Sequence, residues 1–380
     1  MKTQDWTSWQ RAVIKVGSAL IAPNGTQVSD EYILPITRFI LHARELGKEV
    51  ILVSSGSVAA GRADISCHSQ GVTIAEKQAM AAVGQAKMMA NWQRCFDASS
   101  FDVSCAQLLI THADLRDRRR YVNIKNTVRE LLINNVIPII NENDTVATEE
   151  LKVGDNDNLA ALVALVSDAD ILFICSDIDG LYDADPKTNP DAKLLPSVDG
   201  ITKDIYALAG DTQNKIATGG MITKLQAAEK TTNNGINTFI VNGKNENTFS
   251  ELSDNQHVGT WFRAVKSKDS AKKQWLKYTL HARGKLVIDE GAQTALLGNG
   301  ASLLAKGIVS AQGDFVRGDA IDIEYENEII ARGLSQYSKT ELDLIAGKDS
   351  VEFVSILGFR HGSKHIEEII HRDDLVLFNS

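Results

Sequence analysis

Short apolar runs alternate with amphipathic segments along most of the chain. Five of the runs are rich in Val, Ile and Leu and are short, which predicts buried strands. They lie at residues 12–16, 49–53, 103–110, 136–140 and 170–175. Helices are predicted at residues 32–46, 74–96, 123–134, 159–166 and 225–230. This alternation predicts an α/β fold in which helices sandwich an open, mostly parallel sheet.

The pattern changes near residue 265. Residues 266–280 are rich in Lys and Ser and predict a linker. Beyond the linker the apolar segments are short and β-like, and turns separate them. They lie at residues 286–288, 307–309, 320–325 and 329–331. We therefore expect two domains, an α/β domain at residues 1–265 and a small, mostly β, barrel-like domain at residues 281–380.

Composition narrows the classes of protein that fit this pattern. The chain has 380 residues, 43% of them apolar, which allows a sizeable core. It has no basic start followed by an apolar run, and no apolar stretch near the roughly 20 residues that span a membrane. Its four Cys (Cys67, Cys95, Cys105 and Cys175) lack CxxC or zinc spacing, so we expect reduced thiols in a cytoplasmic protein. The net charge of -9 disfavours a nucleic acid as the main partner.

Polar or glycine-rich turns follow four of the predicted strands. Because ligands of open parallel sheets bind beyond the carboxyl ends of the strands, these turns predict one composite site. Lys15 and Gly17 lie at the first strand end, where the glycine lets backbone N–H groups approach an anion and the lysine adds a cation. Ser55 follows the second strand in a turn of small residues. Each turn alone is also compatible with an ordinary strand-to-turn junction.

Two clusters of Asn and Asp lie close together in the middle of the chain. Residues 141–144 follow a predicted strand, and residues 154–158 precede a predicted helix. Short polar arms of this kind suit an amino acid, with Asp144 holding the ammonium and the Asn amides holding a carboxylate. Capping of the helix by Asn156 or Asp157 is a second interpretation. Calcium binding is a third, although EF-hand spacing is absent.

A glycine-rich segment with a lysine precedes the helix predicted at residues 225–230. Its residues are Thr218, Gly219, Gly220, Met221, Ile222, Thr223 and Lys224. Glycines beside a helix N-terminus predict a phosphate site, and a lysine in the first turn opposes the helix dipole unless an anion binds there. Ser176 and Asp177 follow the strand at residues 170–175 and could hold a nucleotide or form a capped turn.

Taken in order, these segments resemble one known family. The motifs are KVGS from Lys15, VSSGSVAAG at 53–61, NENDTVAT at 141–148, KVGDNDNLAA at 152–161, SDIDGLYDADP at 176–186 and TGGMITKLQAA at 218–228. Over about residues 10–262 they are similar to the glutamate 5-kinases of the amino acid kinase superfamily. The tail, with VIDEGA at 287–292 and LLAKGI at 303–308, resembles a PUA domain. The resemblance implies an amino acid kinase catalytic domain followed by a PUA domain.

The resemblance implies an activity and a set of residue roles. The activity is the ATP-dependent phosphorylation of the γ-carboxylate of L-glutamate to L-glutamyl 5-phosphate, the first step of proline biosynthesis. ATP and Mg²⁺ would take part, with the metal expected to bind through the ATP phosphates and with no protein residue assigned to it. The implied catalytic residues are Lys15, Lys224 and Asp157, and the implied glutamate-binding residues are Ser55, Asp144 and Asn156. The implied ATP-binding residues are Lys15, Ser176, Asp177, Thr218, Gly219, Gly220, Met221, Ile222, Thr223 and Lys224.

The resemblance also implies partners, and alternatives stay open beside it. Proline is expected as a feedback inhibitor, a homo-oligomer (tetramer or dimer) is expected, and a glutamyl-phosphate reductase is a possible partner; no membrane is expected. One alternative is a kinase of another small carboxylate, amino acid or nucleoside monophosphate. Another is RNA binding through the PUA domain, which the 16 Asp and Glu against 10 Lys and Arg of residues 281–380 oppose. A binding protein with a degenerate kinase fold is disfavoured because both lysines and Asp157 are present.

Overall fold

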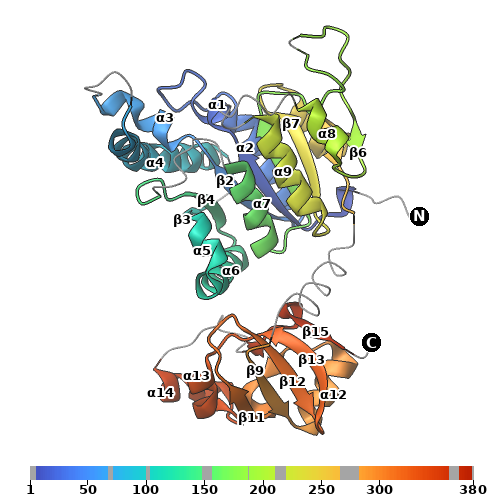
Figure 1. Cartoon of the computed structure of the whole chain (residues 1–380). Coiled ribbons are helices and arrows are strands. Elements are labelled where there is room, and N and C mark those ends of the chain that lie inside the picture. The colour runs from blue at the N-terminus through green and yellow to red at the C-terminus, as the bar shows by residue number, and fades with distance from the viewer. Residues whose placement is uncertain are drawn as a thin grey trace. The chain divides into compact units, whose positions relative to one another are not determined.

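A computed structural model describes most of the chain, and Figure 1 shows its ribbon. The described residues are 6–66, 72–99, 103–147, 156–186, 188–209, 220–265, 282–358 and 368–378. Thr218, Gly219 and the linker expected at residues 266–280 lie outside them. The chain divides into two compact units, residues 1–112 with 131–268 and residues 113–130 with 269–380. The domain boundaries expected from the sequence stay a prediction.

The first unit contains an eight-stranded sheet. Its strand order is β3-β4-β2-β1-β5-β7-β8-β6, and only the β7–β8 pair is antiparallel. The strands are β1 (Arg11–Val16), β2 (Glu49–Ser54), β3 (Cys105–Ile110), β4 (Ile137–Glu142), β5 (Ile171–Ser176), β6 (Ser197–Val198), β7 (Asn237–Asn242) and β8 (Thr260–Phe262). This topology confirms the predicted α/β fold with a mostly parallel sheet.

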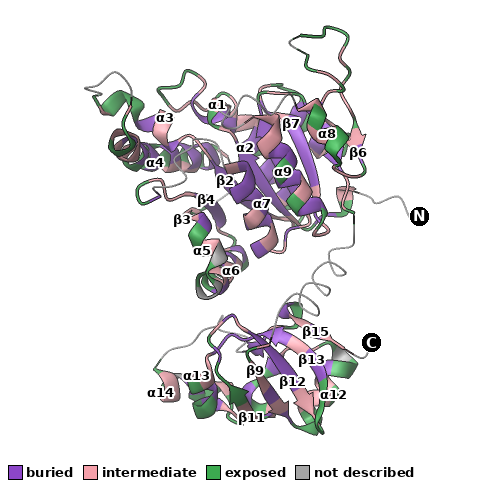
Figure 2. Ribbon diagram, in the orientation of Figure 1, coloured by how far each residue is buried: buried purple, intermediate pink, exposed green. Residues whose placement is uncertain are grey.

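Helices cover both faces of this sheet. On one face, α2 (Ile33–Glu45), α4 (Ile74–Asp97) and α10 (Thr248–Ser253) contribute to one large hydrophobic cluster with the strands. On the other face lie α7 (Asn156–Val166) and α9 (Met221–Thr232), which pack against each other (Figure 1). The central strands are buried on both sides, as the purple ribbon of Figure 2 shows. The shorter helices of this unit are η1 (Trp6–Ser8), α1 (Ser18–Ile21), α3 (Ser57–Gly61), η2 (Arg62–Asp64) and α8 (Lys203–Leu208).

Successive side chains of β1 alternate between the hydrophobic core on one face of the sheet and the charged cluster on the other. Ala12, Ile14 and Val16 point into the hydrophobic cluster beneath α2. Lys15 lies between Ile14 and Val16 in the strand, and its ammonium meets α7 on the opposite face. Because successive side chains of a strand point to opposite faces, the same six-residue strand supplies both the core and a buried cation.

Two glycines hold α3 against α4. A Cβ atom at Gly61 would lie 2.0 Å from the Met80 carbonyl oxygen, and one at Gly84 would lie 1.8 Å from the Ser57 carbonyl oxygen. Any side chain at either position would therefore clash with the backbone of the other helix. The result is a backbone-to-backbone contact that fixes α3, and with it the turn after β2, on α4.

The predicted elements match the observed ones where the apolar pattern is clear. The five predicted strands are observed as β1 to β5, with ends that differ by one or two residues. The helix predicted at residues 123–134 is observed as α6 (Arg118–Ile133), which begins five residues earlier. Strand β7 was not predicted, although it pairs with β5 in the centre of the sheet. No described helix is both long enough and apolar enough to cross a membrane.

The second unit combines the tail with residues 113–130. Its sheet has the order β11-β9-β12-β13-β15, and β10 pairs with β14 in a separate two-stranded sheet. The strands are β9 (Gly284–Ile288), β10 (Leu303–Leu304), β11 (Ile308–Gly313), β12 (Ala320–Tyr325), β13 (Glu328–Leu334), β14 (Glu368–Ile370) and β15 (Leu375–Leu377). The core is centred on Ile321, Ile323, Tyr337 and Phe353.

Helices in the second unit were not expected from the sequence. They are α12 (Glu290–Asn299), α13 (Lys339–Ile345) and α14 (Phe353–Leu357). Two helices from the middle of the chain, α5 (His112–Arg116) and α6, begin in this unit or at its border. Within it, Lys125 Nζ of α6 lies 2.5 Å from Asp374 Oδ1, and the Asn126 side chain donates to Gln336 Oε1 at 3.1 Å.

Candidate active site

The polar turns expected to form one site lie at one edge of the large sheet. Strands β4, β2, β1 and β5 are neighbours and run parallel, so their carboxyl ends meet at that edge (Figure 1). Lys15 is near the end of β1, Ser55 follows β2, Asp144 follows β4 and Ser176 ends β5. The structure thus brings together residues from four separate turns, as ligand sites of open parallel sheets require.

A carboxylate between two ammonium groups is the centre of this edge. Asp157 Oδ1 lies 2.6 Å from Lys15 Nζ, and Asp157 Oδ2 lies 3.2 Å from Lys224 Nζ. The exposed fractions of Lys15, Asp157 and Lys224 are 6%, 0% and 3%. Buried charges are costly unless they are paired, and here two cations share one anion. The cluster therefore carries a net positive charge that suits an anionic ligand.

Two helix N-termini position this cluster. Asp157 lies in the first turn of α7, where the helix dipole stabilises a negative charge. Lys224 lies in the first turn of α9, where the dipole disfavours a cation, so the ion pair with Asp157 is needed to hold it. Thr223 Oγ1 donates to Asp157 Oδ2 at 2.7 Å and also to the Gly220 carbonyl oxygen at 2.9 Å. The start of α9 is thereby tied to the start of α7.

Burial and charge act in opposite directions on the pKa of Asp157. Burial alone would raise this pKa, but the ammonium groups of Lys15 and Lys224, together with hydrogen bonds from Lys15 and Thr223, hold it below the ordinary value. Burial lowers the pKa of Lys224, with Lys15 adding to the effect, while Asp157 and then Asp177 oppose it. Asp157 is therefore an anion at neutral pH.

A second group of polar side chains lies beside the charged cluster. Ser57 Oγ donates to Asp144 Oδ2 at 2.8 Å, and Asn156 Nδ2 donates to Ser55 Oγ at 2.7 Å. Burial raises the pKa of Asp144, the hydrogen bond from Ser57 opposes this, and the charge of Glu142 adds to it. Hydrogen bonds thus join the turn after β2 to the turn after β4 and to the start of α7. These segments contain the three residues implied for amino-acid binding, Ser55, Asp144 and Asn156.

The residues implied for nucleotide binding lie on the other side of β1. Ser176 Oγ donates to Asp177 Oδ1 at 3.2 Å, and Asp177 is exposed while Ser176 is buried. The described part of the glycine-rich segment is Gly220, Met221, Ile222, Thr223 and Lys224. A Cβ at Gly17 would lie 3.8 Å from Lys15 Nζ, so glycine keeps the approach to this ammonium open.

Some contacts at the site involve residues that were not singled out from the sequence. Ser57 holds Asp144, and Asn141 Oδ1 accepts a hydrogen bond from Asn156 at 2.9 Å. Both lie in turns that the sequence did mark as polar, so their types and places were the available signal. Gln85 of α4, which binds Asn141, lies in an Ala/Met/Gln-rich helix without such a signal.

The cluster of Lys15, Asp157 and Lys224 is suited to the transfer of an anionic group between two bound molecules. Among the residues that the structure describes, no three His, Cys, Asp or Glu side chains gather in a way that could hold a metal ion. The cluster instead offers two fixed ammonium groups beside glycine-lined turns, which is the equipment of phosphoryl transfer: positioning and charge stabilisation.

Fold and site together define a phosphotransferase for small molecules. The chain belongs to the amino acid kinase family, whose sequence model matches residues 10–242, and a PUA domain model matches residues 284–357. These matches confirm the family resemblance that the motifs indicate.

Three curated relatives cover nearly the whole chain, and each is named glutamate 5-kinase. That of Idiomarina loihiensis is 54% identical over 97% of this chain and 98% of its own length. That of Salinibacter ruber is 49% identical over 99% of this chain and 100% of its own. That of Xanthomonas euvesicatoria pv. vesicatoria is 45% identical over 96% of this chain and 100% of its own.

Proposed function

We propose that this chain transfers the γ-phosphoryl group of ATP to the γ-carboxylate of L-glutamate and so forms L-glutamyl 5-phosphate, the first step of proline biosynthesis. The names and full-length similarity of the curated relatives support this proposal. The observation that carries it in the structure is the Asp157 carboxylate between the Lys15 and Lys224 ammonium groups.

The acceptor needs no general base. A glutamate side chain has an unperturbed pKa of about 4.3 and is already an anion at pH 7. The barrier is instead the approach of an anionic nucleophile to an anionic phosphate. Lys15 and Lys224 would stabilise the charge on the phosphoryl group in flight, and Asp157 would hold both ammonium groups in place.

The remaining residues would hold the two substrates. Ser55, Asp144 and Asn156 would bind glutamate, with Asp144 on the ammonium. Ser176, Asp177 and the segment from Thr218 through Lys224 would bind ATP. Glycines and a helix N-terminus in that segment fit a phosphate chain because their N–H groups can approach it closely.

A magnesium ion would enter with the nucleotide. Among the described residues, the carboxylate that lies between the two lysines is that of Asp157, which both ammonium groups already occupy. In kinases Mg²⁺ is held by phosphate oxygens of the nucleotide and by water, together with one or two carboxylates. When bound, the ion would neutralise charge on the β- and γ-phosphates, while the protein residues orient the substrates and exclude water.

The direct test combines turnover with capture of the product. ADP release is measured with glutamate, aspartate, acetylglutamate, carbamate and a nucleoside monophosphate, and hydroxylamine traps any acyl phosphate. We expect a hydroxamate with glutamate alone. Turnover with another acceptor and none with glutamate would transfer the proposal to a different kinase of the family.

Two substitutions test the assigned roles. Lys224→Ala should lower kcat by roughly 10²- to 10³-fold, as removal of one preorganised donor does. Lys203→Ala, at an exposed position of α8, should not change kcat. Asp144→Ala should raise the KM for glutamate far more than the KM for ATP. Wild-type turnover in Lys224→Ala, or an unchanged glutamate KM in Asp144→Ala, would contradict the role in question.

Further properties implied by the family resemblance stay predictions. They are inhibition by proline, a homo-oligomeric state, a reductase that accepts the acyl phosphate, and a cytoplasmic location. Proline inhibition is measured in the same assay, with the hydroxamate yield recorded against proline concentration.

A further inference from the structure

A one-directional chain of side-chain amides runs through the amino-acid half of the site. Asn156 Nδ2 donates to Ser55 Oγ at 2.7 Å and to Asn141 Oδ1 at 2.9 Å. Asn141 Nδ2 donates to Gln85 Oε1 at 3.0 Å, and Gln85 Nε2 donates to Gln107 Oε1 at 3.3 Å. Each amide gives its N–H to the next one, so the whole chain points from Asn156 towards Gln107.

This direction decides which atom of Asn156 is left for a ligand. A side-chain amide has two N–H donors and one carbonyl acceptor. Both donors are used, by Ser55 and Asn141, so the carbonyl oxygen Oδ1 is the atom of this amide that can still accept a hydrogen bond from a ligand. Ser55 Oγ accepts from Asn156, which leaves its own O–H to donate. The site therefore offers one acceptor from Asn156 and one donor from Ser55.

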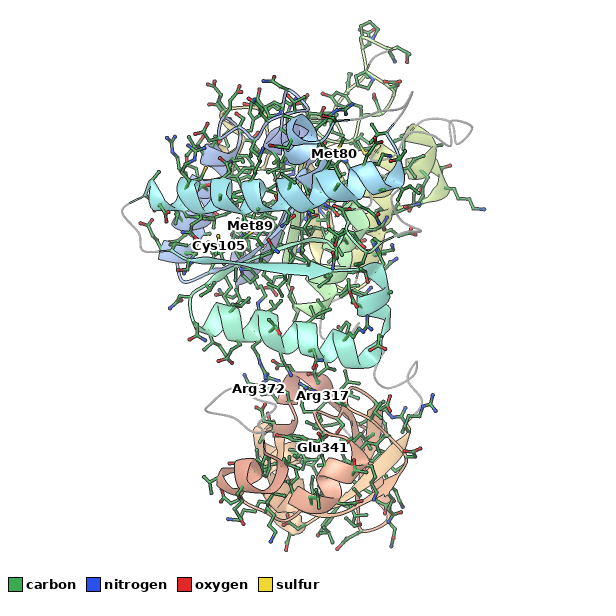
Figure 3. The ribbon with its side chains drawn as sticks, turned by 90° about the vertical axis from the view of Figure 1, so that its left-hand side faces the viewer. Met80, Met89, Cys105, Arg317, Glu341 and Arg372 are labelled. Atoms are coloured by element: carbon green, nitrogen blue, oxygen red, sulfur yellow. The ribbon has the colours of Figure 1, made fainter. Side chains whose placement is uncertain are left out.

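Gln85 is itself held firmly in place. It lies on α4 with 7% of its surface exposed. Its neighbour Gly84 is the residue whose missing Cβ lets α4 touch the carbonyl of Ser57. Figure 3 faces α4, with Met80 and Met89 labelled on it, and shows β3 beside it, labelled at Cys105. Since Ser57 also holds Asp144, the α3–α4 contact sets the positions of Asp144 and, through Gln85, of Asn156.

We propose that Gln85 is a positioning residue that sets the polarity of the amino-acid site. It fixes Asn141, and Asn141 fixes Asn156 with its carbonyl oxygen towards the substrate. Asn156 Oδ1 then joins Asp144 as a second acceptor for the α-ammonium, and the Ser55 hydroxyl donates to a carboxylate. This assignment rests on the proposed function, and it reverses the sequence-based expectation that the Asn amides hold a carboxylate.

The chemistry of the substrate explains why such an orientation matters. An ammonium has three donors and no acceptor, whereas a carboxylate has only acceptors. An Asn156 whose NH₂ group faced the site would meet the ammonium donor to donor. A fixed amide thus selects substrates that carry an α-ammonium, and a freely turning amide would lose part of that selection.

The first experiment removes the acceptor for Asn141. In Gln85→Leu we expect the dissociation constant of glutamate, measured by calorimetry, and its KM to rise about ten-fold, the usual scale for one lost buried hydrogen bond. The KM for ATP should stay within about two-fold. The matched control is Gln93→Leu on the same helix, which removes hydrogen bonds to the Val103 carbonyl and from the Cys105 N–H. It should lower the melting temperature without changing glutamate binding.

The second experiment uses two truncated ligands to determine whether Asn156 presents its carbonyl oxygen or its NH₂ group to the substrate. Glutarate lacks the α-ammonium of glutamate, and 4-aminobutyrate lacks the α-carboxylate. Gln85→Leu should weaken 4-aminobutyrate as much as glutamate and leave the inhibition constant of glutarate within about two-fold. The opposite pattern, in which glutarate weakens and 4-aminobutyrate does not, would place the carboxylate on Asn156 and overturn the proposal.

A conservative variant covers the case in which Gln85→Leu does not fold. Gln85→Glu at pH 8 keeps an oxygen that accepts from Asn141 Nδ2, so glutamate binding should stay within about three-fold of wild type. A ten-fold or larger loss in a Gln85→Glu protein that keeps the wild-type melting temperature would contradict the role of Gln85 as the acceptor for Asn141 and would end the proposal.

Measurements on the wild-type protein distinguish failure of the proposed reaction from failure of the role proposed for Gln85. Binding of glutamate without formation of the hydroxamate would count against the proposed reaction while the Gln85 comparison still proceeds by calorimetry. Glutamate binding that is equal in wild type and Gln85→Leu would overturn this inference alone. Absence of glutamate binding in the wild type would overturn both.

Discussion

Replacing Asp157 with Asn leaves two buried ammonium groups without their shared counter-charge. The substitution keeps the shape of the side chain. It removes the negative charge that lies 2.6 Å from Lys15 Nζ and 3.2 Å from Lys224 Nζ. The new NH₂ group must also face either an ammonium or the hydroxyl of Thr223, which now donates to Asp157 Oδ2.

The size of the effect follows from burial. Breaking a buried ion pair by removing one partner costs about 3 to 5 kcal/mol, because the other charge stays buried and unpaired. Folded domains are stable by about 5 to 15 kcal/mol, so the variant should fold but with much of its stability lost. Turnover should fall by roughly 10²- to 10³-fold, since the two cations are no longer held where the phosphoryl group passes.

A second substitution tests whether the loss of stability comes from the unpaired charges. Lys224→Met removes one of the two unpaired cations, so in the Asp157→Asn background it should restore part of the lost stability. In the wild-type background the same substitution should destabilise, because it removes the ion pair between Lys224 and the buried Asp157 carboxylate, which then keeps only Lys15. Urea unfolding of the four proteins gives the coupling free energy, and ADP release should remain low in all three variants.

The pH dependence gives an independent measurement. Burial lowers the pKa of Lys224, and Asp157 opposes that shift, so Asp157→Asn should lower the pKa further. A lysine whose pKa is lower in the folded state binds fewer protons there than when unfolded, so stability rises with pH in that window. The stability deficit of Asp157→Asn should therefore narrow as pH rises from neutral towards the ordinary pKa of lysine. A deficit that is constant with pH, or equal destabilisation by Lys224→Met in both backgrounds, would refute the electrostatic reasoning.

Three further predictions concern the groups around this cluster. Ser57→Ala removes the hydrogen bond that opposes the burial-raised pKa of Asp144, so the rise in glutamate KM on acidification should begin at higher pH than in wild type; an unshifted pH profile would contradict it. Gly84→Ala places a Cβ 1.8 Å from a backbone oxygen and should lower the free energy of unfolding by at least about 1 to 3 kcal/mol, measured by thermal unfolding. The control is Gly200→Ala, whose Cβ would have no atom within 4 Å and should change stability by less than about 0.5 kcal/mol. Because burial lowers the pKa of Lys224, kcat should decline on the alkaline side before the ordinary pKa of lysine is reached; a flat rate up to that pH would show that this ammonium is not required.

The fold could be predicted where short apolar runs stand between clear turns. Strands β1 and β2 were placed within a residue because Gly17 and Ser55 mark their ends. Strand β7 was not, since its buried part, residues 238–241, is a run too short for periodicity to separate strand from buried helix. The start of α6 was placed late because its first residues are charged and carry no apolar period.

The candidate site could be predicted as a set of residue types but not as a set of contacts. Lys15 was singled out because it adjoins a glycine turn that could admit an anion, and Lys224 because a lysine in a first helical turn opposes the helix dipole. The family resemblance then assigned both their catalytic role. The distances that join them to Asp157 depend on how α7 and α9 pack, which no local pattern encodes. The same holds for Gln85 of α4, whose partner Asn141 lies in β4, far along the chain, and becomes its neighbour only in the folded sheet.

The order in which the chain is synthesised has a consequence for the three charges. Lys15 is made first, in a strand whose neighbour β5 comes much later, and its counter-charge arrives with α7. The second ammonium arrives only with α9. A nascent or truncated chain that ends before α9 thus lacks the second of the two ammonium groups and should have no phosphotransferase activity. Until α7 has been made, Lys15 lacks the Asp157 carboxylate, and its ammonium should stay hydrated.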